Sequence, residues 1–315
     1  MTRTGLKISR RAFLVASAAA LAAGCAGGDP RGTWRLAAGE PGGLYFAFAE
    51  ILGQELKNRY PALTLTALPT AGSVENLGLI RSGNVDMALA QADVTERDRA
   101  QGTSGTAPQA VAQLYEDYLQ AIVRSSAPMQ QFADLEGRRV SVGPSGSGVA
   151  AISEILFAAA GLEGRILPLH LRLKDALAGL TSGSLDAIVW SGGVPTPAIA
   201  DLNAVLPLRM LDLGNLAEPM SRLSGYPYLV RRVPSGGYVT TPGLNSVGIP
   251  DMLLCRPDSP SDLVSATVDV LATDAPQLMP PTIRGLQYLD PPSMIQTGSV
   301  PLHPGAVKAY DELHG

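Results

Sequence analysis

The clearest structural pattern in the chain is the segment Gly39-Glu40-Pro41-Gly42-Gly43-Leu44-Tyr45-Phe46-Ala47-Phe48-Ala49-Glu50-Ile51-Leu52. It follows a short apolar run at residues 34–38, and the apolar positions after Gly43 are spaced as on one face of a helix. The pattern predicts a strand, a glycine loop and a helix N-terminus. Such a loop lets the backbone approach a ligand, and the N–H groups of the first helical turn point toward an anion. We therefore expect a carboxylate or phosphate site whose ligand-binding residues are Gly42, Gly43, Leu44 and Tyr45.

A second copy of this unit lies about 100 residues downstream, where Arg139-Val140-Ser141-Val142 precedes Gly143-Pro144-Ser145-Gly146-Ser147-Gly148. Another pair of segments repeats at nearly the same spacing, because residues 80–89 match residues 180–189. In both members of this pair, a helix ends at a glycine and a buried strand follows an aspartate. Two ordered matches predict two similar α/β lobes, each of which presents a glycine loop to a cleft between them.

Further candidate ligand-binding residues lie where other elements of these lobes reach the cleft. Ser73 precedes a helical pattern, so it is either an N-cap or, together with Val74, a ligand contact through backbone N–H groups. Gln91 follows a predicted strand, at the strand end where open α/β sheets bind ligands. Trp190 ends the equivalent strand of the second lobe, where core packing and ligand contact are equally open. In the second glycine loop the candidates are Ser145, Gly146 and Ser147.

Two further segments are predicted to connect the lobes. Residues 115–124 and 247–254 are mainly apolar, and we interpret them as strands that cross from one lobe to the other. Residues 95–113 are polar and rich in Gly, Ser and Thr, which predicts a mobile excursion. The pair Arg231 and Arg232 is typical of solvated surface, although arginine also matches a carboxylate well, so either residue is a minor candidate for the site.

Several ordered motifs resemble those of the TAXI family, the extracytoplasmic solute receptors of tripartite ATP-independent periplasmic (TRAP) transporters. The resemblance extends from about residue 34 to the C-terminus. The motifs are Gly42-Gly43-Leu44-Tyr45, Gly72-Ser73-Val74-Glu75-Asn76, the Ser82-Gly83, Asp86, Ala88, Gln91 and Asp93 series, Val142-Gly143 with Gly146-Ser147-Gly148, and Leu302-His303-Pro304-Gly305-Ala306.

This resemblance implies a two-lobed α/β fold like that of type II periplasmic binding proteins, with the ligand cleft between the lobes. Lobe I is expected to comprise residues 33–121 and 256–315, and lobe II residues 122–255. The resemblance also implies a receptor that captures a small acidic or polar metabolite, such as a glutamate-like amino acid or an organic acid, and delivers it to TRAP permease subunits. The sequence shows no firm salt-bridging arginine of the kind that dicarboxylate-binding TRAP receptors use, which argues against a strict dicarboxylate.

Residues 1–25 have the pattern of an export signal. Arg10 and Arg11 lie in a basic segment that resembles a twin-arginine motif, and an Ala-rich run of about a dozen residues follows, shorter than the roughly 20 residues that span a bilayer. Ala22-Ala23-Gly24-Cys25 resembles a lipobox, although Leu21 lies one position early. We expect Cys25 to be lipidated and the protein to be anchored outside the cytoplasmic membrane; simple secretion is the alternative.

The remaining composition fits an exported protein that binds small molecules. Removal of residues 1–24 takes away four positive charges and no negative charge, so the formal net charge changes from −4 to −8. An acidic mature chain argues against a nucleic-acid partner. With Cys25 lipidated, Cys255 has no partner for a disulfide, and its apolar neighbours predict a buried thiol. We expect a monomer.

The sequence offers no group suited to catalysis. The second glycine loop has the glycine spacing of a P-loop, but the Lys and Ser/Thr that should follow are missing, and the loop does not match a nucleophile elbow. The histidines, His170, His303 and His314, are far apart and lie near neither a cysteine nor another histidine. We therefore expect no enzyme, cofactor or metal site.

Two other functions stay open from the sequence. A solute-sensing subunit for a membrane kinase needs the same cleft as a transport receptor, so only the neighbouring genes distinguish the two. An exported hydrolase on a similar scaffold requires a nucleophile and a base that the sequence does not show. Among the three functions, capture of a solute for transport is the interpretation that the motifs favour.

Overall fold

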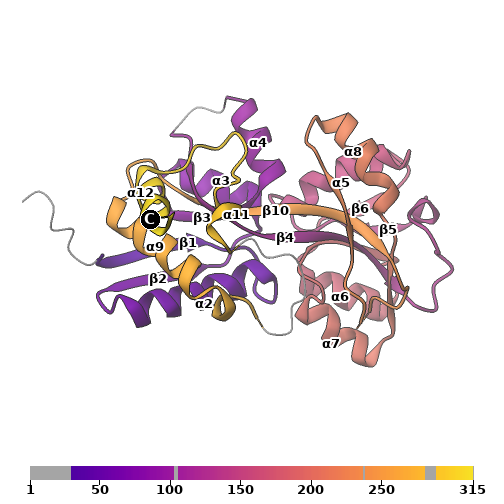
Figure 1. Ribbon diagram of the computed structural model, residues 1–315. Helices are drawn as coiled ribbons and strands as arrows, with labels where there is room; N and C mark the ends of the chain where they lie inside the picture. The colour runs from indigo at the N-terminus through magenta and orange to yellow at the C-terminus, as the bar shows by residue number, and fades with distance from the viewer. Residues whose placement is uncertain (1–29, 103–105, 237, 281–288, 315) are drawn as a thin grey trace, which may run out of the picture.

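The computed structural model describes residues 30–102, 106–236, 238–280 and 289–314. Two α/β lobes lie side by side and are joined by two long strands (Figure 1). The predicted export signal, including Arg10, Arg11 and Cys25, lies outside the described residues. Within the described residues, no helix is both long and apolar enough to cross a membrane.

Short strands alternate with helices along most of the chain. The strands are β1 (Gly32–Ala37), β2 (Leu63–Leu68), β3 (Met87–Gln91), β4 (Gln109–Arg124), β5 (Arg139–Ser141), β6 (Leu167–Leu169), β7 (Ala187–Gly192), β8 (Leu208–Leu211), β9 (Leu229–Arg232) and β10 (Asn245–Cys255). The α-helices are α2 (Leu44–Arg59), α3 (Ser73–Arg81), α4 (Ala92–Ala100), α5 (Gly148–Ala159), α6 (Leu173–Ser182), α7 (Pro197–Val205), α8 (Ala217–Ser224), α9 (Ser261–Thr273), α10 (Ala275–Leu278), α11 (Pro291–Met294) and α12 (Pro304–His314). The 3₁₀ turns are η1 (Phe132–Leu135) and η2 (Gly214–Leu216).

The strands of the two lobes follow the same order pattern when each is followed inward from its own edge of the sheet. The full order is β2-β1-β3-β10-β4-β7-β5-β6, with β8 added to β4 and β9 added to β10. In the first lobe β1 lies between β2 and β3, and in the second β5 lies between β6 and β7, all parallel. Helices cover both faces of each half, as expected for parallel strands that are buried on both sides (Figure 1). The predicted pair of similar α/β lobes is therefore confirmed.

The repeated sequence motifs occupy equivalent places in the two lobes. α3 is followed by Gly83 and α6 by Gly183, and both glycines have the left-handed backbone, with φ of +72° and +79°, that commonly ends a helix. The aspartate that follows each glycine accepts a backbone hydrogen bond from the neighbouring strand. Asp86 accepts from the N–H of Arg35 at 2.7 Å, and Asp186 accepts from the N–H of Arg139 at 2.9 Å.

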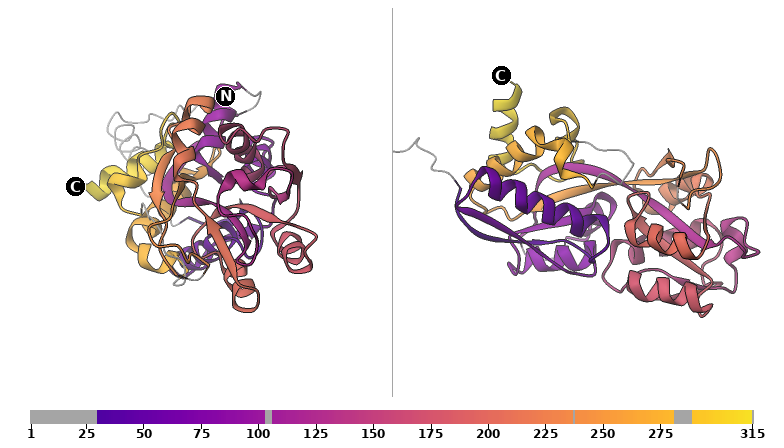
Figure 2. Two further views of the ribbon diagram at one scale, coloured as in Figure 1. Left: turned by 90° about the vertical axis from the view of Figure 1, so that its right-hand side faces the viewer. Right: turned by 90° about the horizontal axis from the view of Figure 1, so that it is seen from below.

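The strands β4 and β10 belong to both lobes and pair with each other in antiparallel register. The first-lobe core contains Val111, Ala112, Leu114 and Tyr115 of β4, whereas Leu119, Ala121 and Val123 pack in the second. β10 makes the reverse passage, with Val247 and Ile249 in the second core and Leu253 and Cys255 in the first. Figure 2 shows both strands running from one lobe into the other. The predicted lobe boundaries, near residues 121 and 255, stay a prediction.

One predicted segment is wrong. Residues 95–113 are not an excursion throughout, because α4 begins at Ala92 directly after β3 and β4 begins at Gln109. The turn-forming residues that favoured a loop are concentrated near Gly102, between these two elements. α4 has Asp93 in its first turn and Arg97 and Arg99 in its last, which is the charge order that the helix dipole favours.

Candidate functional site

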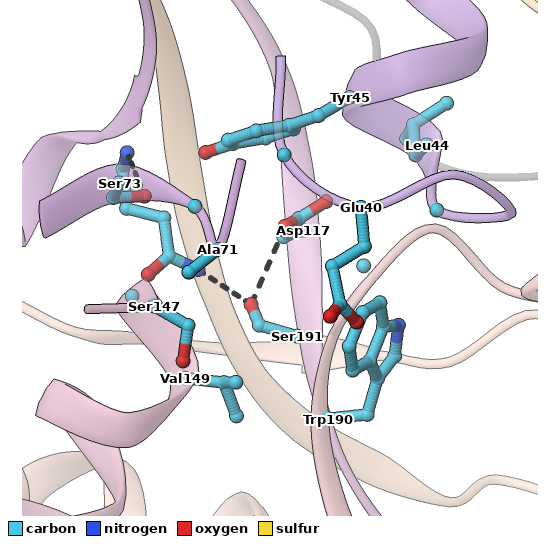
Figure 3. Close-up of a pocket in the computed structure, with 16 residues that line it drawn as sticks. Glu40, Leu44, Tyr45, Ala71, Ser73, Asp117, Ser147, Val149, Trp190 and Ser191 are labelled. Atoms are coloured by element: carbon cyan, nitrogen blue, oxygen red, sulfur yellow. Dashed lines mark hydrogen bonds between the residues drawn. The ribbon is translucent and has the colours of Figure 1, made fainter. Parts of the chain in front are cut away.

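A small cavity lies between the lobes, where the N-terminal ends of α2, α3 and α5 meet the carboxyl ends of β3 and β7 (Figure 3). Its volume is about 50 Å³, enough for a few water molecules. The lining residues are Gly39, Glu40, Gly43, Leu44, Tyr45, Ala71, Gly72, Ser73, Gln91, Asp117, Ser147, Gly148, Val149, Trp190, Ser191 and Gly192. Residues of both lobes contribute to this lining.

The first glycine loop brings three of its four predicted residues to the cavity. Gly43 is the N-cap of α2, and Leu44 and Tyr45 follow in the first turn, where the backbone N–H groups have no partner within the helix. Gly42 is not part of the lining. A Cβ at Gly43 would lie 3.5 Å from the Trp190 ring and 3.2 Å from a backbone oxygen of Glu40, so glycine lets the loop pack against the indole.

Of the two alternatives for Ser73, the N-cap of α3 is not what the structure shows. The N-cap is Gly72, and the Ser73 hydroxyl instead accepts a hydrogen bond from the Gln91 N–H at 3.1 Å, which ties α3 to the end of β3. Ser73 lines the cavity and is buried, whereas Val74 is 43 % exposed and does not line it. Within the first turn of α3, Ser73 is therefore the residue that lines the cavity.

The second glycine loop approaches the first lobe through Gly148. A Cβ at this position would lie 2.0 Å from Oε1 of Gln91 and 2.8 Å from Oγ of Ser73, so only glycine fits without movement of the neighbours. Ser147 lines the cavity and caps α5, because its hydroxyl accepts from the Ala150 N–H at 3.0 Å. Ser145 and Gly146 lie outside the lining. The Gly146 carbonyl instead accepts from the Glu75 N–H at 2.9 Å, a bond between the lobes.

Gln91 and Ser191 occupy equivalent positions in the two lobes and meet across the cavity. The Gln91 side-chain N–H donates to the Ser191 hydroxyl at 2.6 Å, and this hydroxyl donates to Asp117 at 3.4 Å (Figure 3). Trp190 also lines the cavity and is 8 % exposed, and its Nε1 has no hydrogen-bond partner among the described residues. The predicted residues Gln91 and Trp190 therefore lie together, and their role in binding stays a prediction.

Two buried carboxyl groups at the cavity were missed by the sequence interpretation. Asp117 on β4 lines the cavity, and Asp251 on β10 accepts a hydrogen bond from the Tyr45 hydroxyl. Burial raises the pKa of Asp117 to about 7, and burial together with the charge of Asp117 raises the pKa of Asp251 well above its usual range. The available signal was the occurrence of two consecutive acids, Glu116 and Asp117, within a strand that is largely apolar.

Among the described residues, the cavity wall carries negative charge and no positive side chain. Glu40 lines it and accepts from the Leu173 N–H of the second lobe at 2.9 Å, and its pKa is raised, mainly by burial. Arg172 pairs with Glu40 at 3.3 Å from outside, with 58 % of its side chain exposed. The minor candidate Arg231 is bound to Glu116, at 2.5 and 3.0 Å, and does not line the cavity. Arg232 lies exposed on β9.

Other predicted features lie away from the cavity. Asp93 is buried in α4, where the Tyr228 hydroxyl donates to it at 2.7 Å. Cys255 is buried and free, as expected. The Nδ1 of His303 accepts from the Gly305 N–H at 3.0 Å, a local structural contact. Within the described part of the chain, no group of three His, Cys, Asp or Glu side chains is placed to hold a metal ion.

The model of the NMT1-like family matches residues 36–313, nearly all of the chain that the structure describes. The chain belongs to the NMT1-like family. The match begins in β1 and ends in α12, so both lobes and both crossing strands of this NMT1-like protein lie within the family region. The narrower TAXI resemblance remains part of the proposal below.

Solved structures are similar to this NMT1-like protein at low sequence identity. A structure from Bordetella bronchiseptica RB50 is 15 % identical, with 90 % of this chain and 98 % of the other covered and a TM-score of 0.52. The alkanesulfonate-binding protein SsuA from Xanthomonas axonopodis pv. citri, bound to MOPS, is 16 % identical, with 90 % and 84 % covered and a TM-score of 0.48. The substrate-binding protein of an amino acid ABC transporter is 14 % identical, with 78 % and 96 % covered and a TM-score of 0.48. The expected two-lobed fold like that of periplasmic binding proteins is confirmed.

Proposed function

We propose that this protein is an extracytoplasmic receptor that captures a small polar metabolite between its lobes and delivers it to a TRAP-type membrane permease. The observation that carries the proposal is the cavity between the lobes, toward which three helix N-termini are directed. Helix N-termini attract negatively charged groups, so the ligand carries at least one anionic group, as in an amino acid or an organic acid.

The contacts between the lobes support a closed, ligand-retaining state. Gln91 bonds to Ser191, the Glu75 N–H to the Gly146 carbonyl, and Glu40 to the Leu173 N–H. Each is a single hydrogen bond worth about 0.5–3 kcal/mol, depending on charge, so together they stabilise closure without making it permanent. Because the closed cavity holds only a few waters, the ligand enters when the lobes separate and displaces water when they close.

The permease partner and the membrane anchor extend this proposal. The TAXI-like motifs support TRAP permease subunits as the recipient of the ligand, and the lipobox-like Cys25 supports attachment outside the cytoplasmic membrane. The Cys25→Ala variant is expected to leave the membrane fraction and appear in the soluble exported fraction. Membrane association that is unchanged in this variant would contradict the lipid anchor.

The experiment that tests the proposed function is mass spectrometry of molecules released from the purified protein by denaturation, followed by calorimetric titration of the dialysed protein with the identified compound. We expect a polar metabolite with an anionic group at close to one per protein. Absence of any released small molecule, together with no binding to a metabolite panel, would overturn the proposed function.

A further inference from the structure

One buried amide oxygen and one carboxyl pair at the cavity are suited to a positively charged partner. Oε1 of Gln91 receives no N–H or O–H from the described residues. Asp117 receives the Ser191 hydroxyl and shares a proton with Asp251, and this carboxyl pair keeps a negative charge that no basic side chain of the described residues neutralises at the cavity. Gln91 is 2 % exposed and Asp117 is 3 % exposed, and both residues line the cavity. Buried acceptors are almost always satisfied, and a desolvated carboxylate without a cation is costly. These atoms are therefore placed to receive donors from a bound molecule.

The charged groups around Asp117 are negative or already neutralised. Asp251 on β10 interacts directly with Asp117, and a proton held by Asp251 is donated to Asp117. Tyr45 on α2 donates to Asp251, and Ser191 on β7 donates to the second oxygen of Asp117. Glu116, next in β4, is bound by Arg231 from β9, and Tyr115 on β4 and Asp93 on α4 add no positive charge. No Lys, Arg or His of the described residues lines the cavity.

We infer that Asp117, with Asp251 beside it and Oε1 of Gln91, binds a protonated amino group of the ligand, while the N-termini of α2, α3 and α5 receive its carboxylate. This inference rests on the proposed function and narrows the ligand class to amino acids and related compounds that carry both a cationic nitrogen and an anionic group. An organic acid that lacks a basic nitrogen is excluded as the preferred ligand.

The chemistry of an ammonium group fits these acceptors. It carries three donors and a full positive charge, so both a carboxylate and an amide oxygen are suitable partners for it. Hydrogen bonds between an ammonium and a carboxylate are about twice as strong as neutral ones. A ligand with an anionic group in the same place would face Asp117 and Glu40 across a desolvated cavity, and like charges there oppose binding. The cavity wall beside Asp117 therefore favours a cationic group of the ligand over an anionic one.

Binding of the ammonium also changes the protonation of the carboxyl pair. Since the pKa of Asp117 lies near 7 in the empty protein, a fraction of the molecules hold a proton on Asp117 at neutral pH. The cation favours the ionised carboxylate, so this proton is released to solvent when the ligand binds. The affinity for an amine-bearing ligand is thus expected to rise with pH through about 7, until the amine itself begins to lose its proton.

Matched ligand pairs test the inference. The dialysed protein is titrated with L-glutamate and glutarate, L-aspartate and succinate, L-alanine and propionate, and with the molecule released on denaturation. We expect the released molecule to contain a basic nitrogen and the amine-bearing member of a pair to bind at least tenfold tighter. Tighter binding of an acid without a basic nitrogen would overturn the inference and leave the proposed function standing. Absence of any ligand would overturn both.

A substitution assigns the effect to Asp117. The Asp117→Asn variant removes the charge at nearly constant shape and is expected to lose at least tenfold in affinity for the amine-bearing ligand, with the preference over its deaminated partner reduced. Asp201→Asn, on the exposed side of α7, removes the same charge elsewhere and should leave the preference unchanged. Circular dichroism establishes that both variants are folded. An unchanged preference in folded Asp117→Asn would refute the assignment.

A second measurement does not depend on any variant. Titration of the unaltered protein at pH 7 in two buffers of different ionisation enthalpy gives the number of protons released on binding. We expect a fractional release that falls toward zero by pH 9. Uptake of protons, or the same heat in both buffers at pH 7, would contradict the role of the carboxyl pair.

Discussion

The two lobes have the same scaffold but different chemistry at equivalent positions. Glu40 of the first glycine loop corresponds to Pro144 of the second, and Gln91 corresponds to Ser191. Asp251 lies opposite Gln91 on β10, whereas the residue opposite Ser191 on β4 is Leu119. The first lobe therefore contributes most of the acceptors, and the second lobe contributes the surface that closes over them, through Gly148 and Trp190. The repeat explains where the cavity lies, and the departures from the repeat explain what it accepts.

The largest expected effect concerns the folding stability that the ligand-free protein loses by burying the Asp117 carboxylate. Because the folded-state pKa of Asp117 is raised above its usual value of 3.8 to about 7, its protonation stabilises the folded state below pH 4, and this stability is lost as the pH rises toward 7. We expect Asp117→Asn to be more stable than the parent by about 2–4 kcal/mol at pH 8 and equally stable at pH 4. Urea titration of ligand-free protein at both pH values measures this. A parent that gains stability between pH 4 and 7 relative to the variant would contradict the account.

The next largest effect tests the closing surface of the second lobe. Gly148→Ala forces a Cβ against Gln91 and Ser73, and Gln91 is itself held by Ser191, so the lobes cannot close without loss of a hydrogen bond. We expect ligand affinity to fall by at least tenfold, about 1.4 kcal/mol, mainly through faster dissociation. Gly78→Ala, in α3 with no atom near the added Cβ, is the matched control and should bind normally. Parent-like affinity in Gly148→Ala would show that the close approach is not needed.

A smaller effect is expected at the contact that Glu40 makes with the second lobe. Glu40→Gln keeps the acceptor but removes the charge, so its bond to the Leu173 N–H weakens, and we expect dissociation to be about three to ten times faster. Arg172→Ala removes only an ion pair whose arginine is largely exposed and should change the rate less than twofold. Stopped-flow measurement of dissociation compares the two. A larger effect of Arg172→Ala would reverse our assignment.

The smallest expected effect distinguishes two serines of the second glycine loop. Ser147→Ala removes the cap of α5 and is expected to cost about 1 kcal/mol of stability. Ser145→Ala alters a residue outside the cavity lining and should change neither stability nor affinity measurably. Thermal unfolding and calorimetry compare these variants. If Ser145→Ala weakens binding more than Ser147→Ala does, the loop contacts the ligand differently from the structure.

The fold was predictable because its determinants are local and repeated. The two glycine loops mark helix starts, and the two glycines that precede an aspartate mark helix ends, so these boundaries can be predicted from neighbouring residues alone. The repeat of both patterns indicated two lobes. The site was predictable only in part. Gly148 and not Gly146 makes the close approach, because that depends on how the lobes pack against each other.

The carboxyl pair was beyond sequence reasoning for a similar reason. Asp117 and Asp251 are far apart in the chain and are brought together by the register of β4 and β10, in which Asp117 lies opposite Ile249. The antiparallel pairing of two crossing strands is a tertiary property, and a single sequence does not determine its register. Two consecutive acids in a buried strand indicate a buried polar interaction, but the sequence does not show which residue is the partner.

The central claim is that the ligand is held between two lobes that open and close about β4 and β10. Small-angle X-ray scattering of the dialysed protein, with and without saturating amounts of the molecule released on denaturation, tests it most directly. We expect the ligand-free protein to have a larger radius of gyration than the saturated protein, in which the lobes close on the ligand. An identical radius of gyration in both states, with saturation verified by calorimetry, would contradict the claim.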